Sequence, residues 1–71
     1  MSKIVSVPME GKVVKINVKV GDSVQPDQEV MIMEAMKMEM PVSAEHSGVV
    51  KTINVTVGQT FAPDTALIEL E

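Results

Sequence analysis

The sequence predicts an all-β fold, a small sandwich or flattened barrel, from three observations. Val, Ile and Thr are abundant, and these side chains favour the half-buried surface of a pleated sheet. Apolar and polar residues alternate, as in segments 16–20 and 53–57, and Gly, Pro and Asp interrupt these runs often. The two halves of the chain also repeat each other. No segment carries the apolar stripe of an amphipathic helix, so an α-helical fold is not expected.

The repeat has a constant offset of 37 residues. When segment 11–34 is placed over segment 48–71 without a gap, ten of the 24 positions are identical. Unrelated segments of this length match at about one or two positions, so the similarity indicates a duplicated unit. Two such units that bury their apolar faces against each other predict a single pseudo-twofold domain over residues 1–71. The identical pairs are Gly11/Gly48, Val13/Val50, Ile16/Ile53, Asn17/Asn54, Val18/Val55, Val20/Val57, Gly21/Gly58, Pro26/Pro63, Asp27/Asp64 and Glu34/Glu71.

Turn signals fall at matching places in the two halves. Gly supplies positive φ cheaply in segments 20–22 and 57–59, and Pro presets the first central residue of a turn in 25–28 and 62–65. Two four-stranded antiparallel sheets of short strands fit this pattern. The expected strands cover residues 2–7, 12–18, 22–25, 29–35, 38–44, 49–55, 59–62 and 66–70.

A tight hairpin is expected at the centre of the chain, with Met36 and Lys37 as its two turn residues. Two-residue hairpin turns favour Asn-Gly or Gly-containing pairs, because type I′ needs positive φ at both central positions. Met and Lys satisfy neither preference, and a broken local rule without structural gain points to function. The register pairs Ala35 with Met38, Glu34 with Glu39, Met33 with Met40 and Met31 with Val42, which leaves Met31, Met33, Met40 and Val42 on the core face.

The repeat also places the ends of the chain. Adding the offset to the central turn gives positions beyond residue 71, so its symmetry mate is the gap between the last and first strands. We therefore expect both chain ends at the pole opposite Lys37. This arrangement suits either a free-standing protein or a domain of a larger one.

Composition excludes several classes of function. There are no cysteines, so disulfides and thiolate metal sites are ruled out, and a reducing compartment is expected. The net charge is −4 and Phe61 is the only aromatic residue, which argues against nucleic-acid binding. No apolar run has the length of a membrane span, and the N-terminus lacks a signal-peptide core. A soluble, cytoplasmic protein that is monomeric as an isolated domain is the expectation.

Plainer interpretations exist for each conspicuous residue. Lys37 could be an ordinary exposed lysine, and methionines most often fill core and rim positions. A thioether cluster could bind Cu(I), although a β-period apolar stripe is expected anyway. His46 has no companion ligand and is expected in a solvated turn. Glu34 and Glu39 could form an acid/base pair, but no nucleophile, base or phosphate loop accompanies them, so no catalytic residue and no metal site are predicted.

The segment Glu-Ala-Met-Lys-Met-Glu at 34–39 resembles the attachment motif of biotinyl (biotin carboxyl carrier) domains, whose core is Ala/Ser-Met-Lys-Met. Pro-Met-Glu-Gly at 8–11 and Val-Gly-Asp-Ser-Val at 20–24 resemble further family signatures, and the resemblance covers essentially the whole chain. It implies a barrel-sandwich hybrid fold without the extra thumb hairpin of some bacterial carriers. Biotin would be attached at Lys37, and the surrounding site residues would be Glu34, Ala35, Met36, Met38 and Glu39.

The resemblance also implies partners and a role. A biotin protein ligase would attach the biotin, a biotin carboxylase would carboxylate it, and a carboxyltransferase would receive the carboxyl group. The domain itself would be a non-catalytic carrier. Pro and Asp at 26–27 and 63–64 depart from the Gly that the family commonly has before strands four and eight. The alternatives are a lipoyl carrier, which usually has Asp-Lys-Ala at the turn, a Met-rich Cu(I) module and an unmodified structural barrel.

Overall fold

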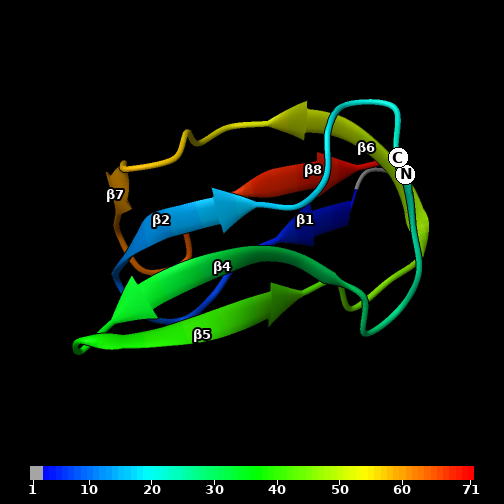
Figure 1. Cartoon of the computed structure of the whole chain (residues 1–71). Coiled ribbons are helices and arrows are strands. Elements are labelled where there is room, and N and C mark those ends of the chain that lie inside the picture. The colour runs from blue at the N-terminus through cyan, green and yellow to red at the C-terminus, as the bar shows by residue number, and fades with distance from the viewer. Residues whose placement is uncertain (1–2) are drawn as a thin grey trace.

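The computed structural model describes residues 3–71, which form eight strands (Figure 1). All eight predicted strands are present, and the structure is all-β as the sequence indicated. Several strands end earlier than predicted, because the chain leaves the sheet near each turn. The segments expected to reach residues 18 and 55 stop at Ile16 and Ile53. The strands are β1 (Lys3–Val5), β2 (Gly11–Ile16), β3 (Ser23–Val24), β4 (Glu29–Ala35), β5 (Met38–Ser43), β6 (Gly48–Ile53), β7 (Thr60–Phe61) and β8 (Ile68–Leu70).

Two four-stranded antiparallel sheets make up the fold. One has the order β1-β8-β6-β3 and the other the order β5-β4-β2-β7. The repeat offset converts the first order into the second, strand for strand, so the two sheets are copies related by the pseudo-twofold. This confirms the predicted symmetry. Residues 3–71 contain no helix long and apolar enough to cross a membrane.

Hydrogen bonds outside the sheets repeat with the same offset. The Gly21 amide donates to the Val50 carbonyl at 2.9 Å, and the Gly58 amide donates to the Val13 carbonyl at 2.8 Å. The strands β2 and β6 also bulge at matching places against β4 and β8, where the register shifts by one residue. The duplicated residues therefore specify a duplicated backbone.

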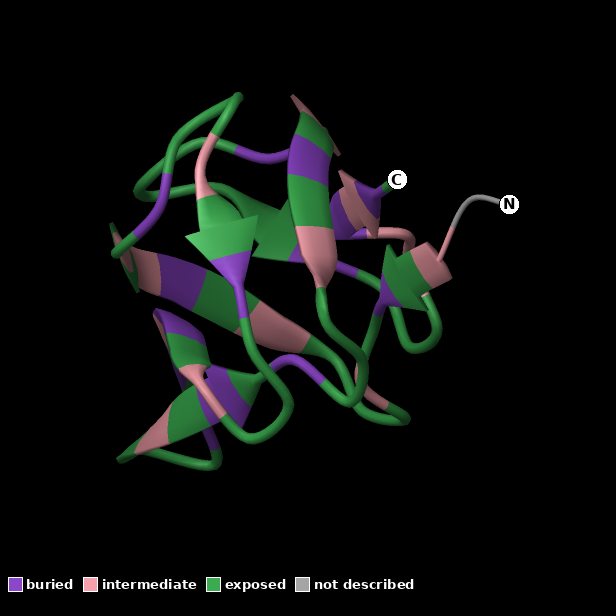
Figure 2. Cartoon of the chain, turned by 90° about the vertical axis from the view of Figure 1, so that its right-hand side faces the viewer, coloured by how far each residue is buried: buried purple, intermediate pink, exposed green. Residues whose placement is uncertain are grey.

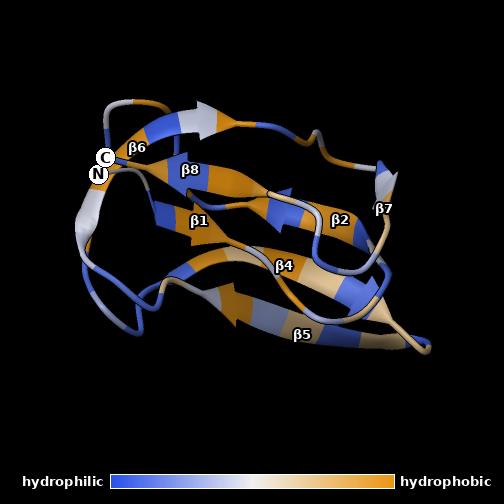
Figure 3. Cartoon of the chain, turned by 180° about the vertical axis from the view of Figure 1, so that it is seen from behind, coloured by the Kyte–Doolittle hydropathy of each residue, from blue (hydrophilic) through white to orange (hydrophobic). Residues whose placement is uncertain are grey.

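The core lies between the two sheets and is built from one face of each strand. Buried and exposed residues alternate along the strands (Figure 2), and hydrophobic and hydrophilic residues alternate with them (Figure 3). Matched positions fill matched places, as Met31 and Ile68 show, both fully buried. Within residues 3–71 no polar or charged side chain is buried. Burial of apolar surface at about 25 cal/mol per Å² is therefore the main stabilising term of the fold.

Four of the turns between strands contain a residue with positive φ, at the positions where the sequence has Gly or Pro-Asp. Gly21 and Gly58 have φ of 96° and 92°. Asp27 and Asp64 have φ of 68° and 62°, each directly after a proline. Asp tolerates this conformation better than most residues with a Cβ, because its short polar side chain bonds locally. The Pro-Asp pairs are thus an alternative solution to a turn that requires positive φ.

The β4–β5 turn and the ends of the described chain lie at opposite poles of the molecule (Figure 1). At the end pole, β1 pairs with β8 so that Lys3 faces Leu70. The long axis of the molecule measures 32 Å, against 18 and 17 Å for the other two. The prediction that Lys37 stands away from both ends is confirmed.

Candidate functional site

The β4–β5 hairpin has the register that the sequence predicted. Ala35 pairs with Met38, Glu34 with Glu39, Met33 with Met40 and Met31 with Val42. Met31, Met33 and Val42 are buried, and Met40 is partly buried against the core. The two strands thus hold the turn rigidly, because one whole face of the hairpin is packed inside the sandwich.

The turn itself is made by Met36 and Lys37, with φ of 54° and 65°. Positive φ at both central residues is what a type I′ turn requires. Neither residue is Gly, Asn or Asp, so each position carries strain of about 1 kcal/mol. The flanking strands impose this conformation, because their right-handed twist matches the type I′ turn and their core faces fix the register. A strained backbone therefore sets the direction of the Lys37 side chain.

Lys37 is exposed at the tip of the hairpin. Within residues 3–71 the one ion pair joins Lys51 to Glu71, at the other end of the molecule, and does not involve Lys37. The amine is therefore accessible from solvent and from a partner protein. An accessible amine can be acylated to an amide, which removes its charge.

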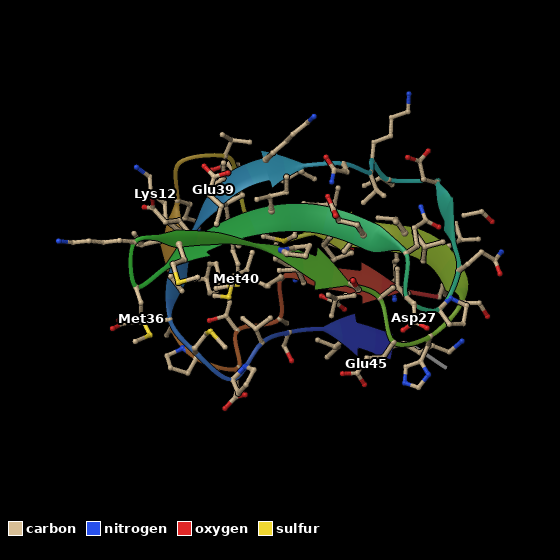
Figure 4. The ribbon with its side chains drawn as sticks, turned by 60° about the horizontal axis from the view of Figure 1, so that its bottom comes forward. Lys12, Asp27, Met36, Glu39, Met40 and Glu45 are labelled. Atoms are coloured by element: carbon tan, nitrogen blue, oxygen red, sulfur yellow. The ribbon has the colours of Figure 1, made fainter. Side chains whose placement is uncertain are left out.

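The described methionines divide sharply by exposure. Met36 and Met38, on either side of Lys37, are 91% and 64% exposed, whereas Met31 and Met33 are 0% and 2% exposed. Met36 projects from the tip of the hairpin, while Met40 lies further along β5 (Figure 4). The core role expected for the methionines is confirmed for Met31 and Met33. Met36 and Met38 were not among the residues predicted to face the core, and they find no core to pack against at the tip of the hairpin.

A row of charged residues crosses the outer face of the same sheet beside the turn. The register places Lys12 on β2 opposite Glu34 on β4, and Glu34 opposite Glu39 on β5. Lys12 and Glu39 lie on the same side of the hairpin in Figure 4. All three are exposed. Two carboxylates and one ammonium therefore give this face of the hairpin a net negative charge. Glu34 and Glu39 were predicted as a pair, whereas Lys12 was not, although the alignment of β2 with β4 could have identified it.

A groove of about 550 Å³ lies beside β4 and shares Lys12 and Glu34 with this charged row. Part of its lining comes from β7, in the second half of the chain. This strand pairs with β2, and β2 in turn lies next to β4. Gly11 allows β2 to lie close to β4, because a Cβ at this position would lie 2.6 Å from the Met33 Cε and 2.9 Å from the Glu34 carbonyl oxygen. The sequence did not predict this groove. Its lining residues are Glu10, Gly11, Lys12, Glu34, Ala35, Met36, Thr60, Phe61 and Ala62.

The remaining sequence candidates lie elsewhere. His46 is exposed in the bend between β5 and β6, as expected of a solvated turn residue. Residues 3–71 contain no group of three or more His, Cys, Asp or Glu side chains that could hold a metal ion. Ala35 is buried at the end of β4, directly before the turn. The exposed chemistry at the turn and beside it is therefore the Lys37 amine, two thioethers, two carboxylates and the ammonium of Lys12.

The whole fold and this hairpin are shared with known proteins. Residues 3–70 match the family described as "Biotin-requiring enzyme", the biotin/lipoyl family. The "Biotin/lipoyl attachment protein" of Bacillus subtilis is 42% identical over 66 residues, which cover 93% of this chain and 90% of that protein. The "Propionyl-CoA carboxylase alpha chain, mitochondrial" of Homo sapiens is 40% identical over 70 residues, which cover 99% of this chain and 10% of that protein.

A solved structure gives the same answer for the fold. The urea carboxylase of Kluyveromyces lactis matches with a TM-score of 0.91 and 30% identity, over 100% of this chain and 6% of the other. The chain therefore spans most of one small relative and only about a tenth or less of the carboxylases. The fold defines a class of small carrier domains. This chain belongs to the biotin/lipoyl attachment family of biotin-requiring enzymes.

Proposed function

We propose that this protein is a biotin carboxyl carrier, with biotin attached covalently to Lys37. The observation that carries the proposal is the turn, where a solvent-exposed lysine stands at positive φ between two exposed methionines. Membership of a biotin-requiring family agrees with it. In attachment, the neutral Lys37 amine attacks the carboxyl carbon of biotin, which ATP has activated as an anhydride with AMP. An amide bond forms, the bond to AMP breaks so that AMP leaves, and the nitrogen loses a proton. When bound, biotin supplies a ureido nitrogen that accepts and releases a carboxyl group.

The residues of this chain fit that group by position rather than by a pocket. The β4–β5 turn, which contains the exposed Lys37, lies at one pole while the described chain ends lie at the other (Figure 1). The domain then acts as a tether that turns bimolecular delivery into an intramolecular step, with effective concentrations of the order of millimolar. It takes no part in bond chemistry itself. We propose biotin protein ligase, biotin carboxylase and a carboxyltransferase as its partners, and the cytoplasm as its compartment.

Each neighbour of Lys37 has a proposed role. Met36 and Met38 present an apolar surface that the ligase contacts on both sides of the amine. Glu34 and Glu39 provide negative charge for electrostatic recognition, which acts mainly on the rate of association. Ala35 keeps the base of the turn compact beneath them.

Intact-mass measurement after incubation with biotin protein ligase, ATP and biotin tests the proposal. We expect one biotin per chain for the native protein and none for Lys37→Arg, which keeps the charge and the fold. Circular dichroism and thermal unfolding of Lys37→Arg provide the control for folding. Biotin on Lys37→Arg, or no biotin on the native chain, would contradict the proposal.

A lipoyl carrier is the second candidate, and one observation favours it. The small relative from Bacillus subtilis carries "Biotin/lipoyl attachment protein" as its description, so its family includes both kinds of arm. The same mass measurement with lipoate ligase, ATP and lipoate separates the two. Lipoate attachment without biotin attachment would replace the first proposal with the second.

A further inference from the structure

The two thioethers beside Lys37 carry chemistry that attachment of an arm does not use. Met36 is 91% exposed and Met38 is 64% exposed, the largest exposures of any methionine in the described residues. Sulfoxide formation at methionine depends on access of the oxidant to the sulfur. Met31 and Met33, at 0% and 2%, are shielded inside the sandwich. Peroxide therefore reaches the pair at the tip of the hairpin before it reaches the core.

The stability of the fold does not explain a methionine at position 36. Its side chain buries almost nothing, and its φ of 54° favours Gly, Asn or Asp instead. Met36 and Met38 are neighbouring exposed apolar side chains, and a contiguous apolar patch of this kind suits contact with a partner. The thioether also adapts to a partner surface, because it is flexible and polarizable. The apolar character of this residue thus serves recognition.

We propose that Met36 and Met38 form a reversible oxidation site that controls attachment at Lys37, an inference that rests on the proposed function. The oxidant is hydrogen peroxide. A sulfur lone pair attacks one peroxide oxygen, an S–O bond forms and the O–O bond breaks. The other oxygen leaves as hydroxide and is protonated to water, so the sulfur loses two electrons and peroxide is reduced. In the reverse direction a thiol-dependent methionine sulfoxide reductase removes the oxygen as water, and two thiols become a disulfide.

The consequence follows from the change in polarity. A sulfoxide is polar and chiral, so it disrupts a contact that a thioether made with an apolar surface. Oxidation at positions 36 and 38 leaves the sandwich intact, because neither side chain belongs to the core. We expect oxidation of both residues to lower kcat/KM for biotin attachment about tenfold, with no change in thermal unfolding.

The experiment uses the whole 71-residue chain before any arm is attached. Graded hydrogen peroxide is followed by peptide mass mapping, and biotin attachment by the ligase is then timed on untreated, oxidised and reductase-repaired protein. Met36 and Met38 should oxidise first, Met9 at 39% exposure more slowly, and Met31 and Met33 last. Repair should restore the untreated rate. The double variant Met36→Leu/Met38→Leu should lose all sensitivity to peroxide relative to its own untreated rate, whereas Met9→Leu should keep it.

Three outcomes overturn the inference. One is fast oxidation of Met31 or Met33, and another is an unchanged attachment rate once both tip methionines are sulfoxides. In each of these cases the untreated protein still takes biotin, so the proposed function stands. The third is an untreated protein that takes no biotin, which overturns the proposed function together with this inference.

Discussion

The two halves of this protein share one backbone arrangement but differ in one connection between strands. Each half contributes two strands to each four-stranded sheet, together with a Gly turn, a Pro-Asp turn and a fully buried residue at the same place in the core. They differ where β4 continues into β5 through Met36 and Lys37, whereas β8 and β1 pair without any turn between them. The shared features therefore account for the fold, and the difference marks the functional site.

The charged residues show the same contrast on a smaller scale. Glu71, the repeat partner of Glu34, lies 4.0 Å from the ammonium of Lys51. The position that matches Lys51 in the first half is Val14, so Glu34 lacks that partner. Glu34 faces Lys12 on β2 and a second carboxylate, Glu39, on β5. The two carboxylates and one ammonium leave a net negative charge beside the turn, and this charge suits recognition by a partner better than it suits stability.

The largest effect is expected from moving the lysine by one position. Neighbouring residues of the turn and strand point in different directions. In the double variant Lys37→Met/Met38→Lys, the amine therefore leaves the tip of the hairpin. Biotin attachment should fall below about 1% of the native rate, which is more than about 2.7 kcal/mol of barrier. Intact mass over time measures it, and equally fast labelling would show that the turn geometry does not select the site.

Gly11 and Gly48 occupy matching positions in the two halves, and they allow a second comparison that concerns stability rather than function. A Cβ on Gly11 would meet the Glu34 carbonyl oxygen at 2.9 Å inside the sheet, while a Cβ on Gly48 would meet that of Glu71 at 2.8 Å. The Cβ on Gly11 would also meet the Met33 Cε at 2.6 Å, whereas the next contact at Gly48 is the Leu70 Cβ at 3.2 Å. Gly11→Ala should therefore cost about 2 kcal/mol and Gly48→Ala about half as much. Urea unfolding measures both, and equal costs would mean that the extra crowding by Met33 does not add to the cost at Gly11.

Relief of the strained turn should produce a smaller, opposite change. Met36→Gly removes a left-handed non-glycine residue and should raise the free energy of unfolding by about 1 kcal/mol. It should also slow biotin attachment, because the apolar contact is lost. Asp27→Gly is the matched control and should shift stability by less than about 0.5 kcal/mol, since Asp tolerates positive φ. Chemical unfolding together with ligase kinetics separates the two effects, and a faster reaction for Met36→Gly would refute a role for the thioether.

The smallest effect concerns charge. Glu34→Lys should lower the rate of biotin attachment about threefold to tenfold at low salt, and the loss should shrink at high ionic strength. Glu39→Lys should act in the same direction. Glu71→Lys changes the net charge equally at the far pole and should have no effect. Unchanged rates for Glu34→Lys at low salt would remove the recognition role of the carboxylates.

Much of this structure could be predicted because the two halves of the sequence repeat the same pattern of strands and turns. The repeat predicted the pseudo-twofold symmetry and the pole of the hairpin, and a two-residue turn predicted the register from Ala35/Met38 to Met31/Val42. The order of the strands within each sheet was not predicted. The strand ends were less predictable, since Ile16 and Ile53 end strands although the apolar alternation continues to Val20 and Val57. Those two valines are 62% and 64% exposed, because the turns carry them away from the core.

The candidate site was predicted in part. The motif identified Lys37 and its neighbours, and the turn preferences identified the strain at Met36 and Lys37. The groove and Lys12 could not be predicted from the motif, since they depend on the pairing of β2 with both β4 and β7. Contacts between strands distant in sequence were the missing information.

Transfer of a carboxyl group tests the central claim most directly. Biotinylated protein is incubated with a biotin carboxylase, ATP and radiolabelled bicarbonate, then separated rapidly and counted. We predict one labelled carboxyl group per biotinylated chain and none on Lys37→Arg treated in the same way. A biotinylated chain that acquires no label, while free biotin in the same assay does, would contradict the carrier function.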